Sequence, residues 1–172
     1  MIKQDLKSTE YNEYYQNYLD KVSDETALIS GFEADKKMVI DFFSSLSKDS
    51  LDYRYQPNKW SVKEVLQHLI DTERIFMYRF LRIARKDSTA LTGFDQDIYI
   101  APSEATNKTL KALLDEFTAT RLYSINLIHS ISDKNLLNIG TASNATISAR
   151  ACAFILLGHS IWHIEIIKER YL

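Results

Sequence analysis

Glycine and proline, the residues that most often interrupt helices, are scarce in this chain. Its 172 residues include only four glycines and two prolines, separated by long stretches of helix-forming residues. So few interruptions favour a small number of long elements. No internal repeat or linker divides the chain, and its length suits one domain, residues 1–172, with a sizeable core.

Four long segments carry apolar residues at a helical spacing. The clearest begins at Ser61, which can form a capping box with Glu64, and we expect a helix over residues 61–86. The same kind of pattern predicts three more long helices: from near Ser23 to Leu46, over 104–130, and from 146 to Tyr171. Because no convincing strand pattern accompanies them, these helices predict an all-α four-helix bundle.

A shorter helix is indicated near the N-terminus, over residues 8–20. Four tyrosines recur there at positions i, i+3, i+4 and i+7, which would place them on one helical face: Tyr11, Tyr14, Tyr15 and Tyr18. We expect this face to pack on the main body of the bundle rather than to form a binding surface.

Residues 87–103, between the second and third long helices, lack a sustained period and include Gly93 and Pro102. We therefore expect a long loop, and long ordered loops are functional disproportionately often. Two of its carboxylates, Asp95 and Asp97, lie close together in "GFDQDIY". The pattern leaves open whether the loop crosses the bundle or covers one end of it.

Charge and composition argue against several classes of partner. The formal net charge of −2, from 21 basic and 23 acidic residues, gives no basic surplus for binding nucleic acid. The N-terminal stretch has no apolar signal-sequence core, and no stretch approaches the roughly 20 apolar residues of a membrane span. The single Cys152 cannot form an internal disulfide and is expected in the core. These features suit a cytoplasmic protein.

Two histidines, His159 and His163, lie four residues apart in the last predicted helix. Such a spacing turns about 400° around the helix, so both side chains project from one face, close enough to share a metal ion. Taken alone, the pair favours ordinary core packing over metal binding. His129 has no histidine partner at this spacing, and we expect it to be structural.

A third histidine, His68, belongs to a different predicted helix. Glu64, Asp71 and Arg79 fall within roughly 60° of it on the helix surface, which makes a polar stripe. Such a stripe faces either solvent or a bundle interior, where ligands from facing helices build metal sites. Three neutral imidazoles with one or two open positions are typical of a catalytic divalent-metal site.

Three stretches together resemble the DinB/YfiT-like superfamily of metal-dependent enzymes: "KWSVKEVLQHLIDTERIFMYRFLRIAR", "GFDQDIY" and "GHSIWHIEIIKERYL". The resemblance implies an up-down-down-up bundle and a metal, zinc or nickel, held by His68, His159 and His163. Members of this superfamily are often homodimers, so the resemblance also implies a possible homodimer. Close relatives often read "GHxxHH", whereas this chain has Trp162 before His163. We expect Trp162 to pack in the bundle rather than to shape a pocket.

An open metal site of this kind would activate water for hydrolysis or ionise a thiol for S-transfer to a small-molecule substrate. Asp71 is the first candidate for a general base, with orientation of an imidazole as an equal alternative. Asp95 can approach the site if the loop folds over it. Arg79 can attract an anionic substrate, although a surface ion pair is favoured. The competing hypothesis is a non-catalytic bundle with a structural or vestigial metal site.

Overall fold

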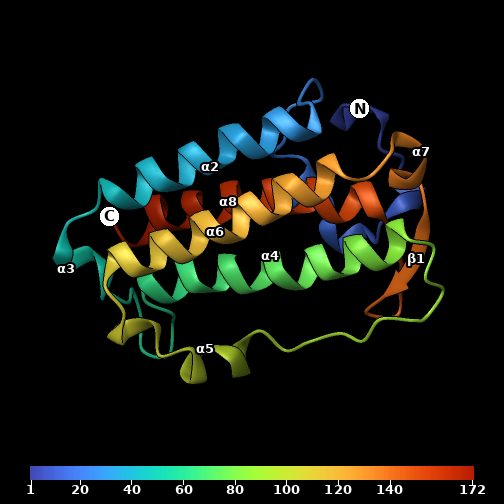
Figure 1. The fold of residues 1–172 in the computed structure, drawn as a ribbon. Helices are drawn as coiled ribbons and strands as arrows, with labels where there is room; N and C mark the ends of the chain where they lie inside the picture. The colour runs from blue at the N-terminus through green and yellow to red at the C-terminus, as the bar shows by residue number, and fades with distance from the viewer.

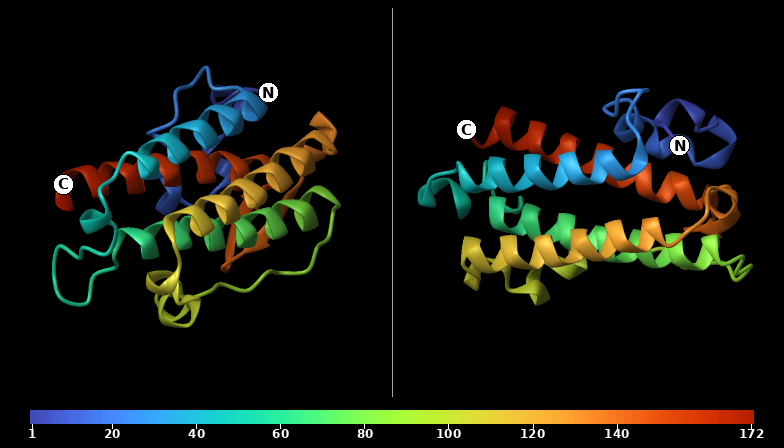
Figure 2. Two further views of the ribbon diagram at one scale, coloured as in Figure 1. Left: turned by 60° about the vertical axis from the view of Figure 1, so that its left-hand side comes forward. Right: turned by 45° about the horizontal axis from the view of Figure 1, so that its top comes forward.

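The computed structural model describes residues 1–172 and contains four long helices (Figure 1). Helices α2 and α8 run in one direction, and α4 and α6 run in the other, so that the order is up-down-down-up. The two further views in Figure 2 show the same arrangement. The predicted four-helix bundle is confirmed, with these bounds: α2, Leu28–Ser44; α4, Val62–Ala84; α6, Leu110–His129; α8, Ala149–Arg170.

The capping box that predicted α4 is present at its first turn. The Glu64 amide donates to the Ser61 hydroxyl at 3.3 Å, and the Ser61 amide donates to the Glu64 carboxylate at 2.6 Å. Arg54 also donates to the Glu64 carboxylate, at 2.8 Å. The two bonds between Ser61 and Glu64 satisfy backbone amide groups that have no partner within the helix. It therefore sets where α4 begins, and with that the direction in which His68 projects two turns further on.

Helix α8 lies in the middle of the bundle and is buried along most of its length. It is long and apolar enough to cross a membrane by length and composition, although no such stretch was expected from the sequence. However, 72% of its most apolar window is buried inside the protein. We therefore describe α8 as the core helix of the bundle, packed mainly against α4.

The N-terminal segment is less regular than predicted. A single helix over 8–20 is wrong, because short 3-10 turns lead into a brief α1: η1, Lys3–Asp5; η2, Ser8–Glu10; η3, Glu13–Tyr15; α1, Gln16–Leu19. Tyr14 is 67% exposed, so the four tyrosines do not share one buried face. Arg150 of α8 donates to the Glu10 carboxylate and to the Asp5 carbonyl, and so anchors the segment on the bundle.

Helix α2 begins at Leu28, later than the predicted start near Ser23. The reason is tertiary, because the chain's first residues pair with the segment just before the helix. The Lys3 amide donates to the Thr26 carbonyl and the Gln4 amide donates to the Asp24 carbonyl, both at 2.9 Å. This pairing holds the backbone before α2 out of the helical conformation. A short α3, Lys48–Leu51, follows α2.

The segment between α4 and α6 returns along the whole bundle, because both helices run in the same direction (Figure 1). It is not loop throughout: it contains α5, Asp97–Ser103, and η4, Ala105–Asn107. Thr109 caps α6 with its hydroxyl, so that α6 begins at Leu110 and not at residue 104. The crossover therefore places the predicted loop beside α4, on the outside of the bundle.

The segment between α6 and α8 contains elements that the sequence did not indicate. After α7, Asp133–Leu136, strands β1, Ile139–Ala142, and β2, Ala145–Ser148, form an antiparallel hairpin. Ser143 and Asn144 make its tight turn with positive φ angles of 52° and 60°. The crossover joins the hairpin, since the Leu91 amide donates to the Thr141 carbonyl at 2.9 Å.

A buried ion network joins three of the long helices. Arg121 of α6 lies 2.7 Å from the Asp35 carboxylate of α2 and 2.9 Å from the Glu73 carboxylate of α4. Its guanidinium also packs over the ring of Phe32, at 4.7 Å. Ser124 donates to Glu73 at 2.6 Å. The three charged side chains are 5% exposed or less, so each depends on the others for compensation.

Candidate metal centre

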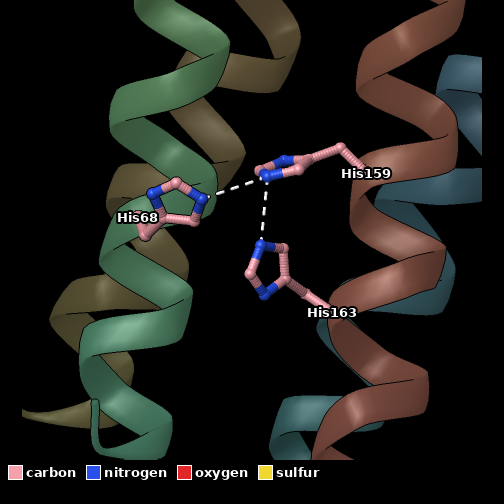
Figure 3. Close-up of side chains that lie close together, drawn as sticks. All are labelled: His68, His159 and His163. Atoms are coloured by element: carbon pink, nitrogen blue, oxygen red, sulfur yellow. Dashed lines mark hydrogen bonds between the residues drawn. The ribbon is translucent and has the colours of Figure 1, made fainter. Parts of the chain in front are cut away.

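Two neighbouring helices bring three histidines together. His68 projects from α4, and His159 and His163 project from the facing side of α8 (Figure 3). The Nε2 atom of His159 lies 3.0 Å from the Nε2 atoms of both His68 and His163. The spacing of four residues thus has the geometric result expected from it. The three histidines predicted from the sequence therefore converge, each through its own Nε2 atom.

The three imidazoles are buried and held in their neutral form. Burial lowers the pKa of His68 to about 4. It also lowers the pKa values of His159 and His163 well below the ordinary range, helped by the repulsion that neighbouring imidazoles would exert when charged. Neutral imidazole is the form that ligates a metal ion. The cluster is therefore ready to bind at neutral pH without first losing protons.

The donor set fits a single divalent ion. A ligand nitrogen lies about 2.0–2.1 Å from a bound zinc ion, so one ion can reach two nitrogens that are 3.0 Å apart. The ligand atoms of all three histidines lie within 4.8 Å of one another, and no carboxylate or thiolate joins them. Three protein ligands and no fourth are characteristic of sites that leave a position open for water or substrate.

The surroundings of the cluster fix the orientation of its rings. The hydroxyl of Thr72, one turn along α4, lies 3.4 Å from Nδ1 of His68 and can accept a hydrogen bond from the Nδ1–H group, which leaves Nε2 free as a ligand. The Trp60 ring lies 4.7 Å from the ring of His68. The ring of Trp162 lies 4.7 Å from that of His163, edge to face. Two indoles therefore flank the cluster.

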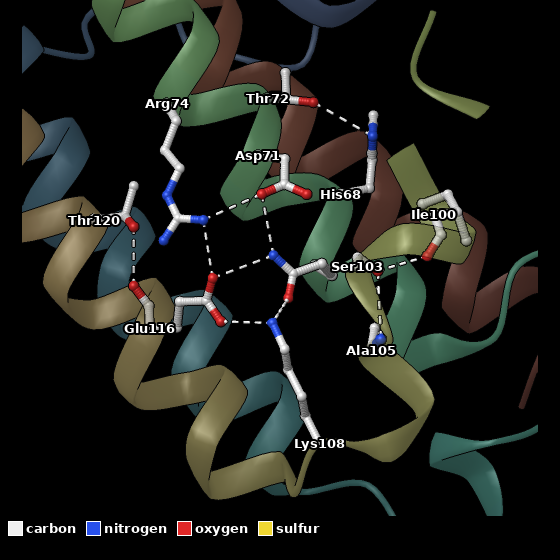
Figure 4. A network of polar contacts seen from close by, with 11 residues as sticks. His68, Asp71, Thr72, Arg74, Ile100, Ser103, Ala105, Lys108, Glu116 and Thr120 are labelled. Carbon is white, nitrogen blue, oxygen red and sulfur yellow. Dashed lines mark hydrogen bonds and ion pairs between the residues drawn. The ribbon is translucent and has the colours of Figure 1, made fainter. Parts of the chain in front are cut away.

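Asp71 is placed in a polar network between α4 and α6 (Figure 4). Its carboxylate accepts hydrogen bonds from Gln67 at 3.1 Å and from Arg74 at 3.2 Å. Glu116 and Lys108 complete the network through Gln67, whose amide donates to Glu116 at 3.3 Å. No hydrogen bond joins Asp71 to a histidine. The structure thus brings the three histidines together and leaves Asp71 outside their immediate contacts.

Asp95 lies at a cavity that reaches the histidines from one side. The cavity has a volume of about 570 Å³, and its lining includes His159, Tyr18 and Thr72. Residues 94–97 of the crossover form part of its wall, so the crossover both traverses the bundle and covers this site. Asp95 and Asp97 are exposed there. Asp95 is therefore brought to the cavity of the candidate site, where a role as a base remains a prediction.

A second cavity, of about 800 Å³, reaches the cluster from the side of His163. Trp162 lines it together with Tyr18, Trp60 and residues of the crossover. Trp162 was expected to pack within the bundle, but it is half-buried and forms the wall of this cavity, edge-on to Tyr18 at 5.6 Å. The departure from "GHxxHH" therefore changes the shape of a space beside the candidate ligands.

Sequence reasoning missed the N-terminal contribution to the site. The ring of Tyr18 stands edge-on to the imidazole of His159 at 5.4 Å. Tyr14 and Tyr18 line both cavities, so the tyrosines do contribute to a potential binding surface. The cluster of four tyrosines could have indicated a binding surface, but their helical spacing led us to predict a packed face instead. Trp60 and Thr72 were also missed, although the spacing of Thr72 from His68 is that of helical neighbours.

Three further residues were given provisional interpretations. Cys152 is fully buried in the core, as predicted, and burial raises its pKa to about 12. His129 is exposed at the end of α6, away from the cluster. The surface ion pair expected for Arg79 is wrong. Its side chain is only 2% exposed, and it donates to the Thr92 carbonyl at 3.0 Å and to the Ser143 hydroxyl at 2.9 Å.

Comparison with known proteins agrees with this architecture. One solved structure, YfiT from Bacillus subtilis, is described as a probable metal-dependent hydrolase with an unusual four-helix bundle topology. It superposes with a TM-score of 0.75 at 16% sequence identity, over 95% of this chain and 89% of YfiT, which shows a common fold. No curated protein sequence matches the chain significantly. The family model of the DinB superfamily matches residues 32–167, and the chain therefore belongs to the DinB superfamily.

Proposed function

We propose that this protein is a metal-dependent hydrolase that holds one divalent ion, zinc or nickel, through His68, His159 and His163. The observation that carries the proposal is the convergence of three buried, neutral imidazoles through Nε2 atoms at the walls of two cavities. The description of YfiT as a probable metal-dependent hydrolase supports the reaction class. A divalent ion bound in this way lowers the pKa of water toward neutrality, or that of a thiol.

The chain's own residues position the ligands and shape the space beside them. Thr72 holds His68 with Nε2 directed at the other two histidines. Trp60 and Trp162 cover the cluster with apolar rings, which limits the access of bulk water and strengthens electrostatic interactions inside. The cavities leave His159 and His163 accessible to a small molecule. A substrate would therefore approach from the cavities.

Asp95 is the side chain that we propose as the base. It lies at the cavity that contains His159, on an exposed part of the crossover where it can exchange protons with solvent. Asp71 is proposed to act only indirectly, by tying Gln67 of α4 to Glu116 of α6. Removing the Asp95 carboxylate should then lower turnover with the metal content unchanged. Removing the Asp71 carboxylate should lower stability first.

A second candidate, transfer to a low-molecular-weight thiol, is favoured by one observation. The cavity at His163 adjoins the one at His159, and together they give the cluster room for two organic reactants. Hydrolysis needs only one such space, because its second reactant is water. The cavity at His163 also includes Lys59, whose ammonium group suits an acidic thiol compound.

The first experiment is elemental analysis of the untagged protein. The matched variants are the triple substitution His68→Ala, His159→Ala, His163→Ala and the exposed His129→Ala. We expect about one divalent ion per chain in the wild type and in His129→Ala, and none in the triple variant. The absence of bound metal, and of uptake from added zinc or nickel, would contradict the proposal.

Activity then separates hydrolysis from thiol transfer and from a structural metal. Metal-loaded protein is assayed on a panel of activated esters and amides, with and without a thiol such as cysteine. Turnover without thiol supports hydrolysis, and turnover that requires the thiol supports transfer. If the metal is structural, we expect no turnover with or without the thiol. His163→Ala should then lose much of its stability.

A further inference from the structure

Arg79 lines the His159 cavity and has no carboxylate partner. Its side chain is 2% exposed, and no Asp or Glu oxygen lies within 4.0 Å of its guanidinium nitrogens. The Thr92 carbonyl and the Ser143 hydroxyl, which accept its hydrogen bonds, are neutral, and so is the neighbouring Tyr15 phenol, whose pKa is raised by burial. Buried charges are ordinarily paired, because desolvation is costly. This guanidinium therefore lacks the compensation that the other buried arginines have.

The other buried arginines make the contrast clear. Arg121 is paired with Asp35 and Glu73, and Arg150 is paired with Glu10. Both of these pairs are internal to the protein, and neither arginine lines the two cavities at the histidines. Arg79 alone among the three is directed at a cavity and left without an anion. A bound anionic ligand would supply the missing charge.

The direction of Arg79 along α4 relates it to the candidate metal site. Arg79 follows His68 by about 16 Å along the helix axis and lies on nearly the same face. Side chains on a helix lean toward its N-terminus, and the Arg79 guanidinium accordingly packs 5.1 Å from the ring of Phe76, one turn nearer to His68. Thr72 and Phe76 lie between the two residues on the cavity wall. A ligand in this cavity can therefore meet Arg79 at one end and His159 at the other.

The walls of the cavity indicate the chemistry of such a ligand. The Arg79 guanidinium packs against the rings of Phe76 and Phe94, at 5.1 and 5.5 Å. Its N–H donors lie in its plane and match the two oxygens of a carboxylate. Asp95 and Asp97 also line the cavity and would repel a dianion more strongly than a monoanion. These features favour a carboxylate attached to an apolar or aromatic body over a phosphate.

We propose that Arg79 binds the carboxylate of the substrate, so that the enzyme acts on small organic acids whose reacting group lies several bonds from the carboxylate. The reaction at the far end rests on the proposed function, but the binding of the carboxylate by Arg79 does not. The bonds to Thr92 and Ser143 hold the guanidinium at the cavity wall. Arg79 is thus a specificity-determining residue.

The test measures binding of benzoate and 3-phenylpropanoate, each compared with its neutral primary amide, by titration calorimetry. The variants are Arg79→Gln and, as a matched control, Arg82→Gln, which alters a surface arginine three residues further along α4 that pairs with Asp87. We expect the acids to bind and the amides to bind at least tenfold more weakly. Arg79→Gln should weaken acid binding about ten- to a hundredfold, and Arg82→Gln should not.

Nuclear magnetic resonance of the wild type gives a readout that does not depend on the variant folding. The Nε–Hε signal of Arg79 should shift when an acid is added and not when its amide is added. A signal that fails to respond, acids that bind no better than amides, or unchanged acid binding in folded Arg79→Gln would each overturn the proposal.

The variant His68→Ala separates this proposal from the proposed function, because a carboxylate can also bind a metal ion directly. Acid binding that survives in His68→Ala but not in Arg79→Gln supports the role of Arg79, whether or not the protein is a metalloenzyme. Acid binding that is lost in His68→Ala but kept in Arg79→Gln overturns the role of Arg79 and leaves the metal site in place.

Discussion

The backbone of Tyr18 packs directly against Gly158, the residue before His159. A methyl group at position 158 would lie 1.9 Å from the carbonyl oxygen of Tyr18, far inside the contact distance of these atoms. Only a residue without a side chain permits this approach. The contact brings the ring of Tyr18 against the imidazole of His159, and it makes the N-terminal segment part of the candidate site.

Gly158→Ala should therefore displace the N-terminal segment from α8. The added methyl group meets backbone, which cannot rotate away, so we expect a loss of at least about 1–3 kcal/mol in the free energy of unfolding. Denaturant titration measures this loss. Gly93→Ala is the matched control, because its added methyl group would come no closer than 3.4 Å to Ser143, which is ordinary contact distance. Equal stability of the two variants would contradict the packing described.

The metal-free protein should lose stability as the pH falls below about 6.5. Burial keeps the three clustered imidazoles neutral in the folded state, whereas the unfolded chain takes up protons near the ordinary histidine pKa of 6.5. The unfolded state then binds more protons, so stability falls from pH 6.5 toward pH 4, by up to about 1.4 kcal/mol per pH unit for each imidazole.

Denaturant titrations between pH 7.5 and 4.5 measure this dependence. Replacing His68, His159 and His163 by glutamine should remove most of it. His129→Gln should retain it, because that side chain is exposed and outside the cluster. A wild-type stability that falls no more steeply than that of the glutamine variant would contradict the neutral state of the cluster.

Thr72→Val should weaken metal binding and preserve the fold. The substitution keeps the shape of the side chain but removes the oxygen that lies 3.4 Å from Nδ1 of His68. Partners that orient a ligating histidine typically contribute a factor of about 10–100 in metal affinity. Competition with a chelator of known affinity measures the change. Thr120→Val, which loses a hydroxyl bonded to the Glu116 carbonyl on α6, should bind metal like the wild type.

Arg121→Met should destabilise the bundle by about 3–5 kcal/mol, because it leaves Asp35 and Glu73 buried without their partner. Replacing Asp35 and Glu73 by leucine in the same protein should recover most of the loss. Arg74→Met, at a side chain that is 49% exposed, should cost no more than about 1 kcal/mol. If Arg121→Met unfolds at the same denaturant concentration with and without the two leucine substitutions, the role of Arg121 in compensating the buried carboxylates is contradicted.

The helices and the three clustered histidines could be predicted because their signals are local. The Ser61–Glu64 capping box places the start of α4 to within one residue, and a spacing of four residues brings His159 and His163 to one face. These relationships depend on the geometry of a single helix, which the sequence contains in full. Even the pairing of His68 with the other two needs only that α4 and α8 be neighbours.

The walls of the candidate site could not be predicted, because they depend on contacts between distant segments. Tyr18 reaches His159 only because Gly158 admits its backbone. The β1–β2 hairpin is too short for a clear alternating pattern, and it is held by the crossover at Leu91 and by packing of Gly140 on Ile83. Likewise, the burial of Arg79 follows from the positions of the crossover and the hairpin turn.

The two indoles that flank the cluster have a practical consequence. Trp60 and Trp162 are the only tryptophans in the chain, and each lies 4.7 Å from the ring of a clustered histidine. All of the tryptophan fluorescence therefore originates beside the candidate ligands. A paramagnetic ion such as nickel(II) bound there would quench this emission, so the untagged and unlabelled chain carries its own optical sensor of occupancy.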